Sequence, residues 1–186
     1  MFDRYLTPSD SGSMQPGDRR VEWCWYDPCD ASSPEFADIM TDRKGVRHNV
    51  TVAASQLRPV AWLSHRSRRH AVIPPLWGKV FSRSSVPLLT AIRSFDNTKA
   101  SFFEGKLLLA GEAFTQIRPH LGASCDVAAM QALSLPLVLK GEMSIDEWEH
   151  RVVEYATEKA IRSRATGVFG MTGQWPEEDE RSSAKL

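Results

Sequence analysis

The most regular pattern of apolar positions lies near the C-terminal end of the chain. From Ser144 onward, apolar residues recur at helical spacing, and the pattern predicts a helix over residues 144–164 that stops at Gly167. Ser144 is followed three residues later by Glu147, which is the spacing of a capping box at a helix N-terminus. Residues 172–186 are polar and charged, and this composition predicts a disordered tail.

A second helix is predicted over residues 126–139, and Pro136 predicts a kink or a break within it. Ahead of this helix, residues 106–110 form a short apolar run, typical of a strand buried on both faces, and Gly111 supplies the turn that ends it. The apolar positions of the second helix are Val127, Met130, Leu133, Leu137 and Val138.

The N-terminal part alternates between apolar and polar residues in two places. Residues 21–26 alternate as a strand requires, and residues 46–53 are predicted to be the second strand of a hairpin pair. Residues 7–20 are rich in Pro, Gly, Ser and Asp, which predicts a loop. Trp23 and Trp25 fall on one strand face, where they could line a pocket for an aromatic substrate or simply pack in the core.

The middle of the chain has weaker patterns. Residues 36–40 suit a short helix or a strand, and residues 54–69 suit a helix interrupted near Pro59. A further short helix is expected around residues 76–81, and residues 86–95 suit a strand or a segment between two lobes. The residues of a short basic cluster could meet an anionic substrate or a cofactor phosphate, although a solvated helix end is the simpler interpretation. This cluster comprises Arg66, Arg68, Arg69 and His70.

Composition limits the class of protein without choosing a partner. Hydrophobic residues make up 42% and charged residues 25% of the 186 residues, as in ordinary globular domains. Lys+Arg and Asp+Glu are equal at 23 each, so no net charge draws the protein to nucleic acid or to an anionic membrane. The three cysteines have no disulfide or zinc spacing, and no metal site is predicted. The absence of a signal-peptide core and of any run of about 18 apolar residues predicts a cytoplasmic protein.

The chemistry of the chain is concentrated between residues 106 and 132. An acid, Glu112, follows the apolar strand and its glycine, and a small-residue run at residues 122–125 opens the second helix. A carboxylate can accept a hydrogen bond from a sugar hydroxyl, and the first amides of a helix can donate to electron-rich atoms of a ligand. His120 has no partner at nucleophile-base or metal-ligand spacing, so it receives no catalytic role.

Residues 106–132 resemble the second flavin-binding signature of the FAD-dependent aromatic hydroxylases. The Arg-Pro-His sequence at residues 118–120 and the run at residues 128–133 are most similar to the dihydroxypyridine monooxygenase branch of that family. Residues 19–26 and 34–42 resemble substrate-domain segments of the same branch. The likeness extends over roughly residues 5–160.

This resemblance implies an α+β fold, in which a partial substrate-domain mixed sheet precedes the C-terminal strand and helices of an FAD-binding domain. The expected division is a substrate-domain-like region at residues 1–100, the C-terminal part of the FAD-binding domain at 101–171, and the tail at 172–186. Such enzymes also have an N-terminal Rossmann-type βαβ unit, whose Gly-rich turn holds the FAD pyrophosphate. The G-x-G-x-x-G pattern of that turn is lacking in this sequence.

The resemblance also implies three cofactor-binding residues. Glu112 would bind the ribityl or ribose part of FAD, and the amides of Cys125 and Asp126 would meet the pyrimidine edge of the isoalloxazine. Glu112 stands where Asp is usual, and Asp126 stands where Asn is usual. Without a flavin, Glu112 is simply a solvated loop acid, and Asp126 is a helix N-cap or first-turn acid.

The implied activity is that of a monooxygenase that uses FAD, NAD(P)H and oxygen to hydroxylate a small aromatic or heteroaromatic substrate, in aromatic degradation or in secondary metabolism. Two alternatives remain open. The chain could be a truncated, non-catalytic paralogue, perhaps folding as a homo-oligomer, or one half of a split flavoenzyme that does not bind FAD alone. A split enzyme predicts an exposed apolar face where the missing half docks.

Overall fold

The protein divides into two compact units. The structure, a computed structural model, describes residues 2–69, 73–84 and 87–177. One unit combines Met1–Pro28 with Phe95–Leu186, and the other is Cys29–Ser94, so the N-terminal segment groups with the C-terminal helices. The assignment of residues 1–100 and 101–171 to substrate and flavin domains stays a prediction, with a boundary that differs from this division.

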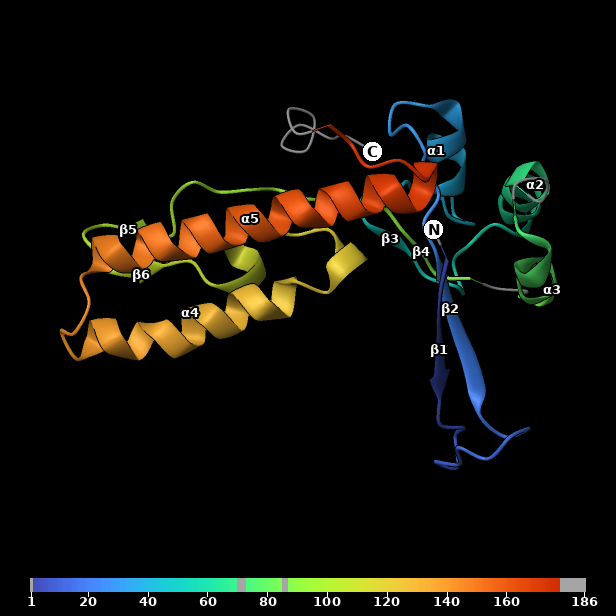
Figure 1. Cartoon of the computed structure of the whole chain (residues 1–186). Helices are drawn as coiled ribbons and strands as arrows, with labels where there is room; N and C mark the ends of the chain where they lie inside the picture. Colours follow the sequence, from blue (N-terminus) through green and yellow to red (C-terminus); the bar gives the residue numbers. More distant parts are fainter. Residues whose placement is uncertain (1, 70–72, 85–86, 178–186) are drawn as a thin grey trace. The chain divides into compact units, whose positions relative to one another are not determined.

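The N-terminal segment is an antiparallel hairpin. Strand β1 (Phe2–Thr7) pairs with strand β2 (Arg20–Trp25), and the predicted loop joins them (Figure 1). The strand expected at residues 21–26 is therefore confirmed, and its partner is β1, a strand that the alternation did not predict. Strand pairing is a long-range property that alternation within a strand does not specify.

Residues 46–53 contribute only a very short strand to the second unit. Strand β3 (Thr51–Val52) pairs antiparallel with β4 (Leu89–Thr90). Val46 and Val50, which supplied the alternation, are each more than half exposed. In the described ranges the strands form three separate two-stranded antiparallel sheets. Two of them, β1-β2 and β3-β4, lie within residues 1–100, where one mixed sheet is predicted.

The described residues of the second unit also form three helices. Helix α1 (Pro34–Ile39) has Ser33 as its N-cap, and the Ser33 hydroxyl accepts a hydrogen bond from the Phe36 amide at 3.0 Å. Helix α2 (Pro59–Arg69) begins at the proline that was predicted to interrupt it, because proline lacks only an N–H that the first turn does not use. Helix α3 (Pro75–Arg83) confirms the short helix expected around residues 76–81.

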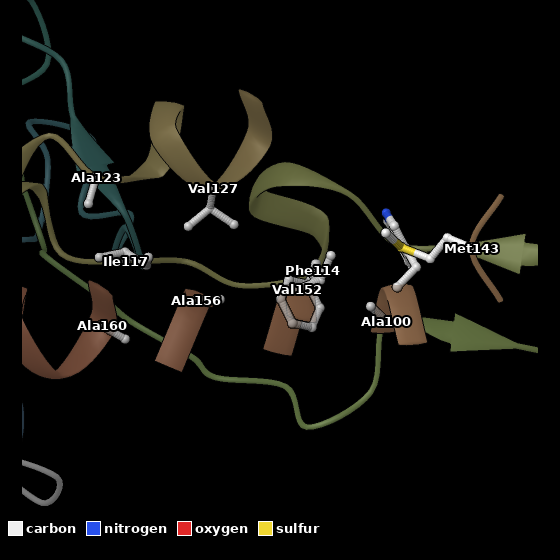
Figure 2. Packing of buried hydrophobic residues seen from close by; sticks show 10 residues of the cluster. Ala100, Phe114, Ile117, Ala123, Val127, Met143, Val152, Ala156 and Ala160 are labelled. Atoms are coloured by element: carbon white, nitrogen blue, oxygen red, sulfur yellow. The ribbon is translucent and has the colours of Figure 1, made fainter. Parts of the chain in front are cut away.

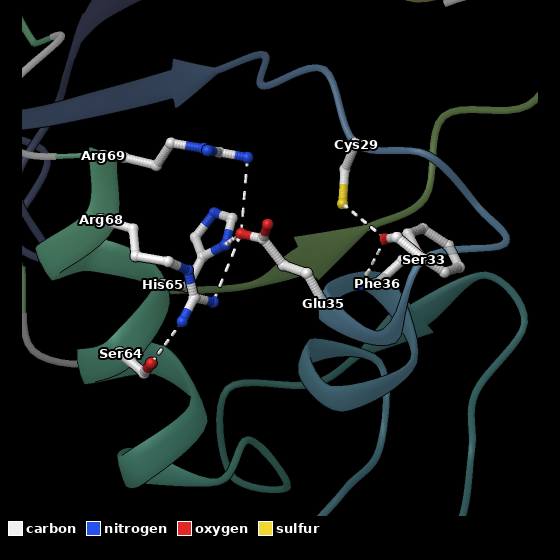
Figure 3. Close-up of polar contacts among 8 residues, drawn as sticks. All are labelled: Cys29, Ser33, Glu35, Phe36, Ser64, His65, Arg68 and Arg69. Carbon is white, nitrogen blue, oxygen red and sulfur yellow. Dashed lines mark hydrogen bonds and ion pairs between the residues drawn. The ribbon is translucent and has the colours of Figure 1, made fainter.

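One carboxylate joins α1 to α2. Glu35 Oε1 lies 2.9 Å from His65 Nδ1, 3.3 Å from Arg68 and 3.4 Å from Arg69 (Figure 3). Burial acts to raise the pKa of Glu35, but Arg69, His65 and Arg68 outweigh it and hold the pKa below its usual range. Two arginines of the predicted basic cluster are therefore ion-paired rather than simply solvated. His70 lies outside the described residues.

In the first unit, the apolar run at residues 106–110 forms a strand at the protein surface. Strand β5 (Ser101–Phe102) pairs antiparallel with β6 (Leu107–Leu108). Leu107 is 46% exposed and Phe103 is 73% exposed, so the prediction of a strand buried on both faces is wrong. The pattern predicts a buried strand because the run is short and continuously apolar. In the structure, however, the run belongs to a two-stranded hairpin with one face exposed.

The predicted second helix is α4 (Ser124–Leu139), and it runs unbroken through Pro136. The predicted break is wrong because apolar packing on both sides of the proline outweighs the loss of one backbone hydrogen bond; Leu135 and Leu137 both pack against the core. The predicted apolar face is also wrong at Leu133, which is 79% exposed.

The predicted third helix is α5 (Ile145–Thr172), which lies alongside α4 (Figure 1). The Ser144 hydroxyl accepts a hydrogen bond from the Glu147 amide at 3.1 Å, so the N-cap is confirmed. The predicted stop at Gly167 is wrong, because α5 continues to a left-handed C-cap at Gly173, with φ of 76°.

Gly167 is required by packing rather than by helix termination. A Cβ atom at this position would lie 2.4 Å from His120 Cδ2 and 2.5 Å from His120 Nε2. Both nitrogens of the His120 ring are buried, so the ring has little room to move. The glycine therefore allows the turn that contains His120 to lie directly on α5.

The core of the first unit lies between α4, α5 and the segment that connects β6 to α4 (Figure 2). Phe114 and Val152 are completely buried in it. The Trp148 indole donates a hydrogen bond to the Ser134 hydroxyl at 3.0 Å and so joins α5 to α4. The buried cluster consists of Ala100, Phe114, Ile117, Ala123, Val127, Met143, Trp148, Val152, Ala156 and Ala160.

The predicted disordered tail begins too early. Thr172 is the last residue of α5, and the Trp175 ring stacks on Phe169 with centroids 4.6 Å apart. Residues 178–186 lie outside the described residues. Within the described ranges, each helix is too short or too polar to cross a membrane.

The Glu35 ion pairs make the second unit sensitive to acid. Because the folded-state pKa of Glu35 is lowered, its contribution is present above the pKa of the unfolded carboxyl and is lost as the pH falls through the folded value. Glu35→Gln should destabilise the protein by about 1 kcal/mol at neutral pH. Urea denaturation across the pH range should show the difference from wild type shrinking in acid, and a pH-independent difference would contradict this assignment.

The contact between His120 and Gly167 predicts a position-specific cost. Gly167→Ala should destabilise the protein by about 1–3 kcal/mol in urea denaturation, because the new methyl group overlaps a buried ring. Gly78→Ala in α3 is the control, since its Cβ would meet nothing within 4 Å. That variant should be neutral or gain up to about 1 kcal/mol from helix propensity. Equal effects of the two substitutions would refute the packing role of Gly167.

Candidate functional site

The acid expected to bind the cofactor lies on a one-turn helix after β6. Gly111 has φ of 58°, a conformation that favours glycine, and it begins the 3₁₀ helix η2 (Gly111–Ala113). The turn predicted at Gly111 is therefore confirmed, but strand β6 ends earlier, at Leu108. Glu112, the second residue of η2, is exposed, so its carboxylate can meet a ligand.

A buried amide of α4 holds this turn in place. Gln131 is only 2% exposed, and its Oε1 accepts a hydrogen bond from the Gly111 amide at 2.7 Å. Its Nε2 donates to the Leu109 carbonyl at 3.2 Å. Gln131 thus satisfies two backbone groups on either side of the strand end and ties η2 to α4. The sequence reasoning gave Gln131 no role, and the available signal was one amide in a strongly apolar helix.

The Arg-Pro-His sequence forms a second turn, which lies on α5. It contains the 3₁₀ helix η3 (Pro119–Leu121), and the Ser163 hydroxyl donates to the Arg118 carbonyl at 2.6 Å. The His120 ring meets Tyr26 edge to face, with centroids 4.8 Å apart. His120 therefore has a packing role in this structure.

Arg118 of this turn interacts with two other charged residues, Arg164 and Asp96. Arg164 of α5 is buried and donates to Asp96 at 2.6 Å. Burial lowers the pKa of the Arg118 guanidinium, repulsion from Arg164 lowers it further, and Asp96 opposes both effects. The Asp96 carboxylate thus offsets part of the positive charge of two neighbouring arginines.

The start of α4 has the features expected of a ligand-facing helix end. Gly122 is left-handed, with φ of 64°, and a Cβ there would meet nothing within 4 Å. The N-cap residue is Ala123, and it makes no side-chain hydrogen bond to the first turn. Asp126 is a first-turn acid and not the N-cap, which decides between the two alternatives. The first backbone N–H groups of a helix point toward its N-terminus and have no partner within the helix.

Asp126 has a cationic neighbour on α5. Its carboxylate lies 3.8 Å from Lys159 Nζ, and more than half of its side chain is exposed. Lys159 therefore offsets part of the negative charge that Asp126 brings to the helix start. Cys125, the other predicted contact through its amide, is also exposed.

The structure places two of the three predicted residues, Cys125 and Asp126, on α4 and the third, Glu112, on η2. The η2 turn packs against α4 near Ala128, whose Cβ lies 3.8 Å from the position of a Cβ at Gly111. Cys125 and Asp126 lie three and two residues before Ala128, which is about 3–4.5 Å along the helix axis. Across residues 2–69, 73–84 and 87–177, no group of three or more His, Cys, Asp or Glu side chains is placed to hold a metal ion.

Comparisons of the sequence and of the fold with known proteins agree with one another. Residues 3–94 match the family described as FAD binding domain-like. The chain is 29% identical over 156 residues to the 2,6-dihydroxypyridine 3-monooxygenase of Paenarthrobacter nicotinovorans, which is 81% of this chain and 37% of that protein. Its fold is similar to that of 2,6-dihydroxypyridine-3-hydroxylase from Arthrobacter nicotinovorans, with a TM-score of 0.78, 20% identity, and coverage of 100% of this chain and 46% of the other.

These matches show that the chain is similar to FAD-dependent proteins. The similarity to a dihydroxypyridine monooxygenase is the one that the sequence resemblance predicted. The chain spans less than half the length of the relatives that it matches. The three predicted cofactor contacts lie outside residues 3–94, so their roles stay predictions.

The two hydrogen bonds of Gln131 predict a local defect when they are removed. Gln131→Leu keeps the side-chain volume but leaves the Gly111 amide and the Leu109 carbonyl buried without this partner. It should lower the free energy of unfolding by about 1–3 kcal/mol and accelerate hydrogen exchange at the Gly111 amide. Gln174→Leu, at an exposed position after α5, is the control and should leave both measurements unchanged. An unchanged exchange rate at Gly111 in the Gln131 variant would exclude the clamp.

Proposed function

We propose that this chain supplies the isoalloxazine side of the FAD site in a flavin monooxygenase that hydroxylates a small aromatic or heteroaromatic substrate with NAD(P)H and oxygen in the cytoplasm. The observation that carries the proposal is the turn of Glu112 held against α4 by Gln131, beside a helix start that has no side-chain cap. The similarity to the 2,6-dihydroxypyridine 3-monooxygenase of Paenarthrobacter nicotinovorans supports the substrate class.

The chemistry of the exposed groups suits a flavin. The Glu112 carboxylate would accept hydrogen bonds from ribityl or ribose hydroxyls, and the amides of Cys125 and Asp126 would donate to the pyrimidine edge of the ring. Gly122 leaves open space beside that helix start, so a flat ring can approach the backbone. A bound flavin would supply the redox chemistry, while these residues bind and orient it.

Lys159 changes the electrostatic effect of Asp126, the unusual acid at the start of α4. A carboxylate near the pyrimidine edge opposes negative charge on a reduced flavin, and this repulsion is stronger where water is scarce. The Lys159 ammonium, 3.8 Å from Asp126, reduces that opposition. Asp126 is therefore compatible with the proposed cofactor through its amide and not through its side chain.

A second candidate function is a half-site that holds FAD only together with further polypeptide, or a non-catalytic paralogue. Its support is the share of the relatives that this chain spans, 37% of one and 46% of the other. The exposure of Glu112, Cys125 and Asp126 also favours it, because a buried site normally encloses most of a cofactor.

Reconstitution with FAD tests the proposal. The purified 186-residue protein, dialysed with excess FAD and desalted, should retain flavin with quenched fluorescence, and Glu112→Ala should weaken its affinity about tenfold through loss of a charged hydrogen bond. Glu154→Ala, at an exposed position of α5, is the control and should bind FAD as wild type does.

The amount of flavin that the desalted protein retains distinguishes the two candidate functions. Complete loss of flavin on desalting from a protein whose circular dichroism shows folded helices would refute autonomous binding and favour the half-site. Equal affinity of wild type and Glu112→Ala would refute the role of Glu112 while leaving the bound flavin to be assigned elsewhere. Stoichiometric flavin would justify assays of NAD(P)H oxidation with phenols and hydroxypyridines.

A further inference from the structure

The charges of this chain are separated between its two units. The second unit, Cys29–Ser94, contains ten Arg and Lys residues and four Asp and Glu residues, which gives a formal charge of +6. The first unit contains thirteen and nineteen, a formal charge of −6, so the total of zero conceals the separation. Solvent-exposed charges are screened beyond about 8 Å at physiological ionic strength. An anionic surface that approaches the second unit therefore meets the positive charge of that unit rather than the neutral average.

The few acids of the second unit are engaged within it. One accepts hydrogen bonds from a neighbouring serine, and the other three are paired with arginine or histidine side chains. These acids are Asp30, Glu35, Asp38 and Asp42. Among the described residues, no Asp or Glu forms an ion pair with Arg66 of α2 or with Lys79 and Arg83 of α3. The positive charge of these three side chains is therefore not compensated by an acid at contact distance.

Lys79 and Arg83 lie on the exposed side of α3. Helices α2 and α3 pack through Trp62 and Phe81, whose ring centroids are 5.5 Å apart. Lys79 and Arg83 are two residues before and after the buried Phe81, which places each of them about 160° around the helix from it, and both are exposed. They are also one turn apart, and like charges at this spacing repel each other. An anion bound between them would reduce that repulsion.

Apolar residues of α2 extend this surface. Val60, Leu63 and Arg66 follow one another at intervals of three residues, so they lie along one side of α2. Val60 is 79% exposed and Leu63 is 47% exposed. Arg66 Nη1 donates to the Ser82 carbonyl at 3.4 Å, so its side chain reaches from α2 to α3. The basic face, as we call this surface, comprises Val60, Leu63, Arg66, Lys79 and Arg83.

The composition of the basic face distinguishes among anionic partners. Nucleic acid binds through phosphate contacts to cations and through stacking of bases on aromatic rings, and the basic face contains no ring. Exposed apolar side chains beside Arg and Lys suit the boundary between lipid headgroups and acyl chains, where the cations stay at the headgroups and the apolar groups enter. We propose that the basic face binds the surface of a bilayer that contains anionic lipids. The inference does not depend on flavin, because the predicted contacts with FAD lie in the first unit.

Vesicle co-sedimentation tests the basic face in the full 186-residue protein. Wild type should bind vesicles of equal parts phosphatidylglycerol and phosphatidylcholine, should not bind vesicles of phosphatidylcholine alone, and should lose affinity as the salt concentration rises. The double variant Lys79→Glu, Arg83→Glu should bind the anionic vesicles more than about tenfold more weakly. Leu63→Ser should bind them about threefold more weakly, because a smaller apolar surface enters the bilayer.

The matched control is the double variant Arg19→Glu, Lys140→Glu. It changes the net charge by the same amount at exposed positions of the first unit. Its affinity for the anionic vesicles should stay within about twofold of wild type, because these two positions lie outside the proposed contact and are screened from it. All variants should keep the wild-type circular dichroism, since each replaced side chain is exposed.

Four results would overturn the proposal. The first is equal binding to both kinds of vesicle, and the second is an equal loss of affinity in the two double variants. Unchanged binding of Leu63→Ser is the third, because it would exclude entry of the apolar residues into the bilayer. The fourth is the absence of vesicle binding. In that case, binding of a DNA duplex in fluorescence anisotropy would assign the face to nucleic acid, and salt-sensitive self-association in light scattering that Lys79→Glu, Arg83→Glu abolishes would assign it to the acidic unit of a second copy.

Discussion

The close approach of the Arg-Pro-His turn to α5 is the contact on which the first unit depends. One face of α5 carries only small residues at Ala156, Ala160, Ser163 and Gly167, spaced by three or four positions. Small side chains bring the backbone of the turn near the helix, where Ser163 holds the Arg118 carbonyl and Gly167 admits the His120 ring. The turn then positions Gly122 and the start of α4. A larger residue on this face would displace the helix start and not only the turn.

Hydrogen bonds from buried side chains add to this packing. Gln131 connects α4 to the η2 turn, and the Trp148 indole connects α5 to α4, so each helix is joined to a neighbour by a buried hydrogen bond. Such bonds add specificity, because a shifted helix would leave buried donors and acceptors without partners. The turn of Glu112 and the start of α4 are therefore held in one geometry by the fold of the chain itself.

Local signals in the sequence predicted local structure well. The N-cap at Ser144 and the loop after β1 follow from the chemistry of single residues and short segments. The partner of β2 was not predicted because a strand's partner depends on distant sequence. The helix stop predicted at Gly167 was wrong because the reason for this glycine is a ring 47 residues away in the chain. Gln131 was overlooked because one amide in an apolar helix has the same local pattern whether it faces solvent or backbone.

The contrast between Glu112 and Gln131 has an evolutionary consequence. Glu112 is exposed at the end of a turn, whereas Gln131 is buried and bonded to two backbone groups. Selection for a folded protein alone retains Gln131 and tolerates many residues at position 112. Selection for a ligand at the turn retains an acid there as well. The pattern of substitutions at these two positions among close descendants therefore records whether a lineage was kept for its fold or for what the fold binds.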